Sequence, residues 1–442
     1  MATISKQLSE FLILYCKEVG HLQFKYSFCL RHSLFIPYTY KWKWDLPENR
    51  SDIDDFSSPS SPYRLTNSKT KGHTRPGLAY AIRLLQETSQ LTITFPTPAN
   101  WSKQIDDEIA KYIPDTQDPI RSRLRIAQIG EIVDEMLILP NFIGGLFPFC
   151  TSLFTLTPYQ QANGTVLSAI RKPDICLLDL AYWDLFCLIR TFGSKIPILI
   201  LSFGNTTATL LGVGPEELGG RGDVATKAEL LAKETGRNID EIIIELFVPE
   251  KGQITDLVGL PQVYDYECHV KLSILVHNDA RPPIPASLRV KLEASDNVLI
   301  SAWAPQNLIL GHKATAWFLT HCGQNSVLES LSHGIPMIAW PVDADQPMNA
   351  MYVGDLKHKV GYELLEVLQR DESKPLYRGY TPSGTLNAIE EEFRTVLQNA
   401  FGRDGAMKRR NAEMFKEKLS RLWNEDGDAR MELRRFIKDH LS

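Results

Sequence analysis

The sequence predicts an α/β protein built on mostly parallel sheets, and three observations support this prediction. The chain has 442 residues, which favours two domains of roughly 200 residues each over a single hydrophobic core. Apolar segments of strand length alternate with amphipathic segments of helix length, the order that places parallel strands between covering helices. In the second half, polar and aromatic clusters follow successive strands, as they do at the ligand-binding edge of such a sheet.

The composition is that of a soluble globular protein. Apolar residues make up 43% of the chain and charged residues 23%, and a net charge of -5 gives no attraction to nucleic acid or anionic lipid. The seven cysteines are scattered and lack the spacing of a zinc site, which favours a reducing, cytoplasmic location. No apolar run approaches the roughly 18 residues of a spanning helix, and the tail is short and charged, so no transmembrane anchor is expected.

In the first half, residues 1–62 form an N-terminal extension whose structure the pattern does not define, since 51–62 has the Ser-, Asp- and Pro-rich composition of a loop. A helix is predicted over 74–87, because its apolar residues recur on one face. Four elements follow in alternation: a strand at 91–95, a strand at 175–180, a helix at 180–191 and a strand at 197–203.

A helix predicted over 226–247 precedes the second half, which repeats the alternation. Its predicted elements are strands at 298–301, 315–320 and 335–340, a helix at 326–333 that Gly334 and Pro336 terminate, and a charged helical tail from 386. We therefore divide the chain into the extension, a first domain at 63–265, a second domain at 266–425 and a helical tail at 426–442.

The clusters that follow the strands of the second domain suit the parts of a nucleotide sugar. Trp303 offers a flat face for a base, and the amide of Gln306 can donate to and accept from its edge. Glu329, one turn into the predicted helix, can accept from two hydroxyl groups, as a ribose diol requires. Asp345 and Gln346 follow the next strand and could hold sugar hydroxyls.

A diphosphate would suit the turn before the predicted helix. Gly323 lets the backbone approach a phosphate closely, Asn325 and Ser326 begin the helix, and His321 lies just before it. The N–H groups of a helix N-terminus bind anions without further machinery. Taken singly, Asn325 and Ser326 would be an ordinary N-cap and Trp303 a core residue, whereas their order and spacing together favour a donor site.

Residues 303–346 closely resemble the donor-binding box of the family 1 UDP-glycosyltransferases. The matching positions are Trp303, Pro305-Gln306, His312, Phe318, His321-Cys322-Gly323, Asn325-Ser326, Glu329, Gly334, Pro336, Pro341 and Asp345-Gln346. The resemblance implies a GT-B fold, in which two Rossmann-like domains with mostly parallel sheets face each other across a cleft. In that fold, 63–265 would bind the acceptor and 266–425 the UDP-sugar.

The resemblance also implies roles for individual residues. Trp303, with its neighbour Ala304, would bind uracil, and Gln306 would read uracil or ribose. Glu329 would hold the ribose hydroxyls and His321, Gly323, Asn325 and Ser326 the diphosphate, while Asp345 and Gln346 would hold a sugar for which Gln346 favours glucose. Gln324 stands where plant members usually have Trp, which alters a sugar contact more than nucleotide binding.

A catalytic base is expected in the first domain. Gly72-His73-Thr74-Arg75-Pro76 resembles the family's Gly-His-x-x-Pro motif, and Pro173 to Asp179 resembles its Pro-Asp-x-x-x-x-Asp strand, so His73 would be the base and Asp179 its partner. Histidine titrates near neutrality and can take a hydroxyl proton, and a carboxylate stabilises the imidazolium that forms. Read without the motifs, His73 is a surface loop residue and Asp179 a helix N-cap, and Asp184 is a weaker candidate partner.

Two stretches depart from the family pattern. Residues 63–70, where the first strand is expected, are polar, and nothing between 264 and 301 fits the strand that opens the donor domain. The only Ser-Phe-Gly, at 202–204, fits the end of an acceptor-domain strand better. The acceptor pocket is expected to include a loop at 140–148, with Phe142, Phe147 and Phe149.

Three functions remain open on the sequence. The first is an inverting, UDP-sugar-dependent transferase that moves a hexose, with glucose favoured, onto a hydroxyl of a small lipophilic acceptor of secondary metabolism. It would use no cofactor and no metal. The second is a truncated UDP-sugar-binding relative with weak or no activity. The third, suggested by Asp343 and Asp345, is a metal-dependent transferase of another fold.

Overall fold

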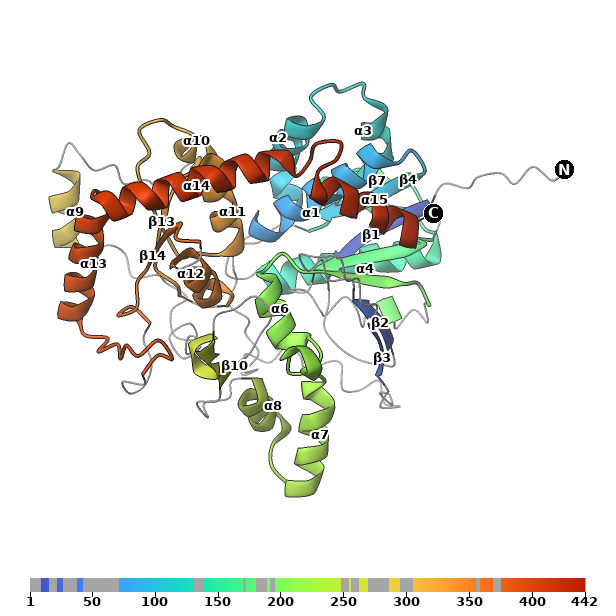
Figure 1. Ribbon diagram of the computed structural model, residues 1–442. Helices are drawn as coiled ribbons and strands as arrows, with labels where there is room; N and C mark the ends of the chain where they lie inside the picture. The colour runs from blue at the N-terminus through green and yellow to red at the C-terminus, as the bar shows by residue number, and fades with distance from the viewer. Residues whose placement is uncertain are drawn as a thin grey trace. The chain divides into compact units, whose positions relative to one another are not determined.

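The computed structural model resolves the chain into helices and strands that form two compact units, each described here by itself (Figure 1). One unit comprises Met1–Phe203 with Glu425–Ser442, and the other comprises Gly204–Asn424. The sequence-based division falls at 265/266, so the structure groups 204–265 with the second unit. The structure describes residues 9–15, 22–26, 38–42, 71–130, 138–169, 172–179, 189–190, 195–247, 254–255, 262–268, 286–294, 305–342, 344–354, 358–368 and 375–441.

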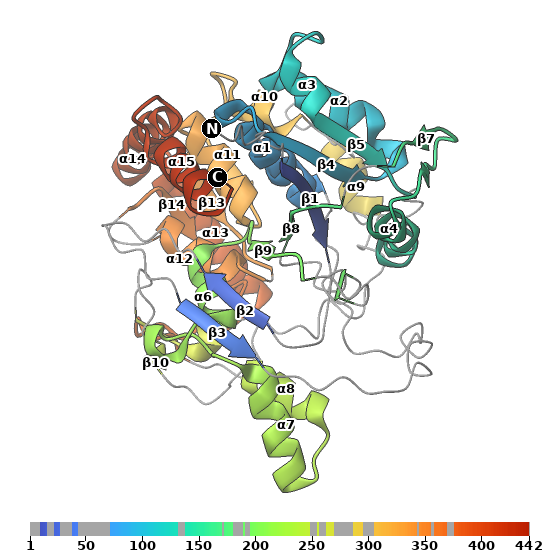
Figure 2. The same ribbon diagram turned by 90° about the vertical axis from the view of Figure 1, so that its right-hand side faces the viewer.

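The first unit is built on a five-stranded sheet in the order β5-β4-β1-β8-β9, in which every pairing is parallel (Figure 2). Its strands are β1 (Ser9–Tyr15), β4 (Leu91–Thr97), β5 (Leu124–Gln128), β8 (Ile175–Asp179) and β9 (Ile198–Leu201). The strand order runs outward from β1 in both directions. This is the doubly wound arrangement, in which ligands bind at the carboxyl edge beside the point of reversal.

The central strand of this sheet comes from the N-terminal extension. β1 pairs with β4 on one side and with β8 on the other, where Tyr15 lies opposite Asp179. The expectation that the first strand immediately precedes the Gly-His motif is therefore wrong, because the strand lies far upstream of residues 63–70. The intervening segment contains an antiparallel pair, β2 (Leu22–Tyr26) and β3 (Tyr38–Trp42).

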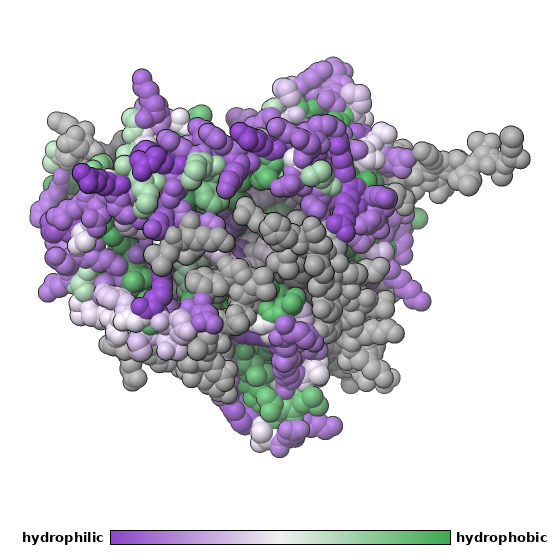
Figure 3. All heavy atoms as spheres, in the orientation of Figure 1, coloured by the Kyte–Doolittle hydropathy of each residue, from purple (hydrophilic) through white to green (hydrophobic). Residues whose placement is uncertain are grey.

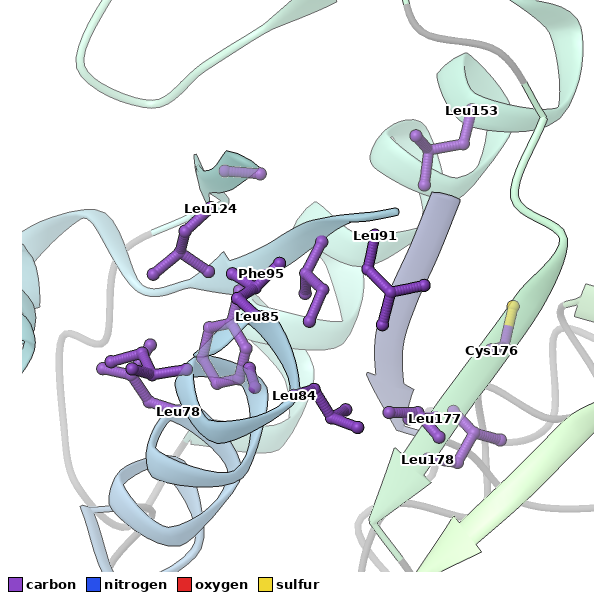
Figure 4. Close-up of a cluster of buried hydrophobic side chains, with 14 of the residues drawn as sticks. Leu78, Leu84, Leu85, Leu91, Phe95, Leu124, Leu153, Cys176, Leu177 and Leu178 are labelled. Atoms are coloured by element: carbon purple, nitrogen blue, oxygen red, sulfur yellow. The ribbon is translucent and has the colours of Figure 1, made fainter. Parts of the chain in front are cut away.

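Helix α1 (Lys71–Glu87) supplies one wall of the first core, because its apolar residues recur on the face that packs against β4. Leu78, Ile82 and Leu85 are at most 1% exposed, and Figure 4 shows α1 leucines gathered with Phe95 of β4. Full burial of one such side chain contributes about 1.5–3 kcal/mol. The predicted helix at 74–87 is confirmed and begins three residues earlier, at Lys71.

Further elements of the first unit cover the sheet and its rim. They are η2 (Ala99–Trp101), α2 (Ser102–Tyr112), α3 (Pro119–Arg123), α4 (Ile138–Thr155), β6 (Tyr159–Gln160), β7 (Val166–Leu167) and α15 (Asp428–His440). Leu433 of α15 joins the core, and the rings of Phe436 and Tyr80 meet edge to face at 6.2 Å. The C-terminal segment, predicted to be a helical tail, therefore packs as part of this unit.

The second unit contains a three-stranded parallel sheet in the order β12-β13-β14. Its strands are β12 (Phe318–Thr320), β13 (Met337–Ala339) and β14 (Gly361–Glu363). Helices α11 (Gln324–His333), α12 (Gln346–Gly354) and α14 (Arg403–Arg421) lie around it (Figure 1). The remaining elements are α6 (Thr206–Val213), η4 (Glu216–Leu218), α7 (Val224–Thr235), α8 (Ile239–Phe247), β10 (Ile254–Thr255), β11 (Val263–Tyr264), η5 (Asp265–Cys268), α9 (Ala286–Glu293), α10 (Gln306–Leu310) and α13 (Leu386–Ala400).

One predicted helix of this unit is wrong. The apolar pattern over 226–247 belongs to two helices, α7 and α8, because Gly236 ends the first in a left-handed conformation at φ +67°. The two helices pack on each other. Leu230, Leu231 and Ile239 remain exposed, and Figure 3 shows apolar side chains at the surface of α7 and α8. The strand expected at 298–301 and most of the helix expected at 180–191 lie outside the described residues.

Candidate functional site

The predicted strand-tip clusters lie at one edge of the second sheet. β12 and β13 are neighbouring parallel strands with Thr320 opposite Ala339, so the residues that follow each strand emerge side by side. The turn 321–323 leads from β12 into α11, while residues 340–342 follow β13 and residues 344–345 precede α12. The sequence-predicted elements at 315–320, 326–333 and 335–340 are confirmed, with shorter strands and with a helix that begins earlier, at Gln324.

The turn before α11 is held in a strained conformation. Cys322 has φ +67°, a region that non-glycine residues seldom occupy, and its N–H donates to Thr320 Oγ1 at 3.1 Å. Burial raises the pKa of the Cys322 thiol far above its ordinary value, so this side chain is not a nucleophile. A Cβ at Gly323 would lie 2.6 Å from His321 Nε2, so the imidazole occupies space that any other residue at 323 would need.

Helix α11 begins directly after this turn. Its first helical hydrogen bond runs from Val327 N to Gly323 O at 3.1 Å, so the N–H groups of its first turn are not used by the helical ladder. Ser326 is buried and Asn325 is half-buried in that turn. The N-terminus of a ten-residue helix, preceded by an exposed histidine, can receive a phosphate group.

A polar pair lies one helical turn further along. Gln306, the first residue of α10, donates from Nε2 to Glu329 Oε2 at 2.7 Å. Both side chains are half-buried. The bond fixes the carboxylate on the same helix whose N-terminus faces the strand edge, where it can accept hydrogen bonds from a diol.

The cluster after β13 is already part of a hydrogen-bond network. Asp345 Oδ2 accepts from Asn205 N at 2.8 Å, and Gln346 Oε1 accepts from Val342 N at 2.9 Å and so closes the turn into α12. Ala344, between them and the strand, has φ +53°. Each of the two strand tips therefore contains a non-glycine residue with left-handed backbone conformation, Cys322 in one and Ala344 in the other. Such residues are concentrated at ligand sites.

Sequence reasoning missed two residues that bind these tips together, Asn205 and Asn349. Asn205 Nδ2 donates to Asn349 Oδ1 at 2.7 Å, and Asn349 Nδ2 donates to Cys322 O at 2.9 Å. An Asn before Thr-Thr-Ala-Thr is a recognisable N-cap signal, and it marks the start of α6. No local pattern shows that this cap also bonds to residues of the box.

The expected base and its partner belong to the first unit. His73 lies in the first turn of α1, and Asp179 is the last residue of β8, where it is 2% exposed. Since α1 ends at Glu87 and β4 begins at Leu91 at the amino edge of the sheet, the first turn of α1 extends toward the carboxyl edge. Asp179 ends its strand at that edge, beside the point where the strand order reverses.

Several predicted residues gain no support. Trp303, Ala304 and Asp343 lie outside the described residues. The loop expected at 140–148 is wrong, because these residues belong to helix α4 and Phe149 is fully buried in the core. Among the residues that the structure describes, no group of three or more His, Cys, Asp or Glu side chains could hold a metal ion.

Comparison with known proteins identifies the box. Residues 291–372 match the sequence family described as UDP-glucoronosyl and UDP-glucosyl transferase. This stretch of the chain is therefore similar to UDP-glycosyltransferases. The UDP-glycosyltransferase eriJ of Hericium erinaceus is 38% identical over 169 residues, which are 37% of this chain and 33% of that protein. The zeatin O-xylosyltransferase of Phaseolus vulgaris is 35% identical over 162 residues, 37% of this chain and 32% of that protein.

The chain thus matches about a third of the length of each of these two relatives. A solved structure of Phytolacca americana UGT2, complexed with UDP-2fluoro-glucose and pterostilbene, is similar with a TM-score of 0.51 and 16% identity, over 84% of this chain and 97% of that one. This similarity shows the GT-B fold and confirms the predicted α/β class with parallel sheets. Within the described part of the chain, no helix combines the length and apolar character needed to cross a bilayer.

Proposed function

We propose that the chain is an inverting UDP-sugar-dependent glycosyltransferase that moves a hexose, with glucose favoured, onto a hydroxyl of a small lipophilic acceptor. The observation that carries the proposal is the Gln306–Glu329 pair on the helix whose N-terminus follows β12. A half-buried carboxylate one turn from a helix N-terminus would let one helix hold both the ribose diol and the diphosphate of UDP. The relatives named above are a UDP-glycosyltransferase and a zeatin O-xylosyltransferase, which supports a sugar nucleotide as donor.

In the proposed reaction, His73 takes the proton of the acceptor hydroxyl while its oxygen attacks the anomeric carbon. Asp179 stabilises the imidazolium that results. The bond from the anomeric carbon to the diphosphate oxygen breaks with its electron pair on UDP, and the N-terminus of α11 stabilises that charge. A single attack from the opposite face inverts the centre, so an α-linked donor yields a β-glycoside.

The proposal requires no metal and no cofactor, because the helix N-terminus and His321 supply the diphosphate site. Trp303 and Ala304 would bind uracil, Ser326, Asn325 and Gly323 the diphosphate, and Asp345 and Gln346 the sugar. Because no metal is required, donor binding should be insensitive to EDTA. The sequence-based expectation of a cytoplasmic protein also remains part of this proposal.

The test uses the purified full chain with UDP-glucose and a panel of lipophilic alcohols and phenols, with UDP release as the measurement. Transfer is expected, and His73→Ala should abolish it while UDP affinity by calorimetry stays within about twofold. A folded chain that ignores UDP would overturn the proposal. UDP binding without release on any acceptor would favour the second candidate, a UDP-sugar-binding relative, which the partial match to longer relatives also motivates.

A further inference from the structure

The residue that caps α6 occupies an unusual place in the second unit. Asn205 is 9% exposed, and its Oδ1 accepts from Thr207 N at 2.8 Å and from Ala208 N at 3.2 Å. These two bonds are those of an ordinary N-cap. Its backbone N–H and its Nδ2 bond to residues more than a hundred positions away, at the tip of β13 and on α12.

The side-chain amides of Asn205 and Asn349 form a directed chain of hydrogen bonds. Asn205 Nδ2 donates to Asn349 Oδ1, and Asn349 Nδ2 donates to the carbonyl of Cys322. The chain starts from the backbone N–H groups of α6, which require an acceptor, and ends at a backbone carbonyl, which requires a donor. Both amides are therefore fixed in one orientation, because a flip would break three bonds at Asn205 and two at Asn349.

We propose that Asn205 is a positioning residue for donor binding, acting through Asn349 on the turn at Cys322 and so on the diphosphate. This rests on the proposed function. The backbone N–H of Asn205 also engages Asp345 Oδ2 at 2.8 Å, a bond that does not depend on the side chain. The Asn349 bond holds the strained peptide at Cys322, which sets the direction of the first N–H groups of α11.

A second brace keeps α6 in place if the amide chain is cut. Thr207 Oγ1 and the Tyr352 hydroxyl lie 2.8 Å apart, so α6 remains tied to α12. Asn205→Ser preserves a capping oxygen but removes the donor to Asn349, which makes it a selective substitution. Asp223→Ser is the matched control, because Asp223 caps α7 by accepting from Thr226 N at 2.9 Å and contributes no group to the box.

The experiment measures dissociation constants for UDP and for uridine by calorimetry without acceptor, in wild type, Asn205→Ser, Asp223→Ser, Asn349→Ala and the Asn205→Ser/Asn349→Ala pair. Asn205→Ser is expected to lower the affinity for UDP relative to uridine roughly tenfold, the size of one hydrogen bond to a charged group. The pair should lose no more than Asn349→Ala alone, because Asn205 acts through Asn349. Asp223→Ser should leave the ratio unchanged.

A purely structural role for Asn205 would lower the unfolding temperature and leave the ratio of UDP to uridine affinity at its wild-type value, and that result would overturn the inference alone. If Asn205→Ser does not fold, Asn205→Asp, which keeps a strong cap and also lacks the donor, provides the same comparison. Wild-type protein that binds neither ligand would overturn the proposed function together with the inference. Additive losses in the paired variant would show that Asn205 does not act through Asn349.

Discussion

Replacement of Glu329 by Ala tests the assignment of the ribose subsite. The substitution removes the carboxylate whose Oε2 accepts from Gln306 Nε2 at 2.7 Å, and with it the acceptor assigned to two ribose hydroxyls. A hydrogen bond to a charged group contributes about 1.5–3 kcal/mol. Because Gln306 is half-buried and its amide can turn to water, the expected loss of UDP affinity is ~1–3 kcal/mol, roughly 5- to 150-fold in Kd.

The assay that isolates this contact compares UDP with 2′-deoxy-UDP by calorimetry. Wild-type protein should prefer UDP by about tenfold, the value of one such bond, and Glu329→Ala should bind the two ligands with nearly equal affinity. Glu390→Ala is the control, since Glu390 is exposed on α13 and pairs only locally with Arg394 at 2.7 Å among the described contacts. If Glu329→Ala retained the preference for UDP, the ribose assignment would be refuted even with overall affinity reduced.

Three further predictions concern other parts of the chain. Asp179→Asn, at a buried strand end, should lower kcat by more than tenfold in the UDP-release assay while the Kd for UDP is unchanged, because only the charge that stabilises the protonated base is lost. Leu85→Ala should destabilise the first unit by about 2–5 kcal/mol in urea unfolding, because the side chain is 1% exposed in the core. Burial raises the pKa of Glu366, but hydrogen bonds from Tyr380 and from 383–384 outweigh it and hold the pKa below its ordinary value. Ionised Glu366 therefore stabilises the folded state above the ordinary glutamate pKa, and this contribution is lost as the pH falls through the lowered pKa. Glu366→Gln should lower the free energy of unfolding at pH 7 and make it less dependent on acid pH in urea titrations.

The box could be predicted from sequence because its geometry is largely local. His321 to Ser326 form one turn and the start of one helix, and Asp345-Gln346 form the corresponding tip of the next strand. A parallel pair places consecutive strand tips at one edge, so the order of residues along the chain already implies their convergence. The contact between Gln306 and Glu329 was not predicted as a bond, but both residues were assigned to the same nucleoside.

The first sheet was less accessible to sequence reasoning, because its central strand is separated in the chain from the helix that it would normally precede. The apolar run at Phe11–Cys16 is of strand length, yet periodicity alone cannot identify its partners. Only the pairing of β1 with β4 and β8 shows that 9–15 completes the sheet. The prediction of one helix over 226–247 is wrong for a different reason. The apolar repeat continues across Gly236, but the left-handed backbone conformation of Gly236 ends the first helix there.

The network around Asn205 shows why a matching box does not by itself define a working site. The left-handed peptide at Cys322 costs energy that the turn alone does not recover, and Asn349 and Asn205 supply hydrogen bonds that hold it. Asn205 lies outside residues 291–372, the stretch that matches the family, so a relative could keep every box residue and lose this support. Donor affinity in such a chain would then depend on the start of α6 as much as on the box, which is the dependence that the ratio of UDP to uridine affinity in Asn205→Ser measures.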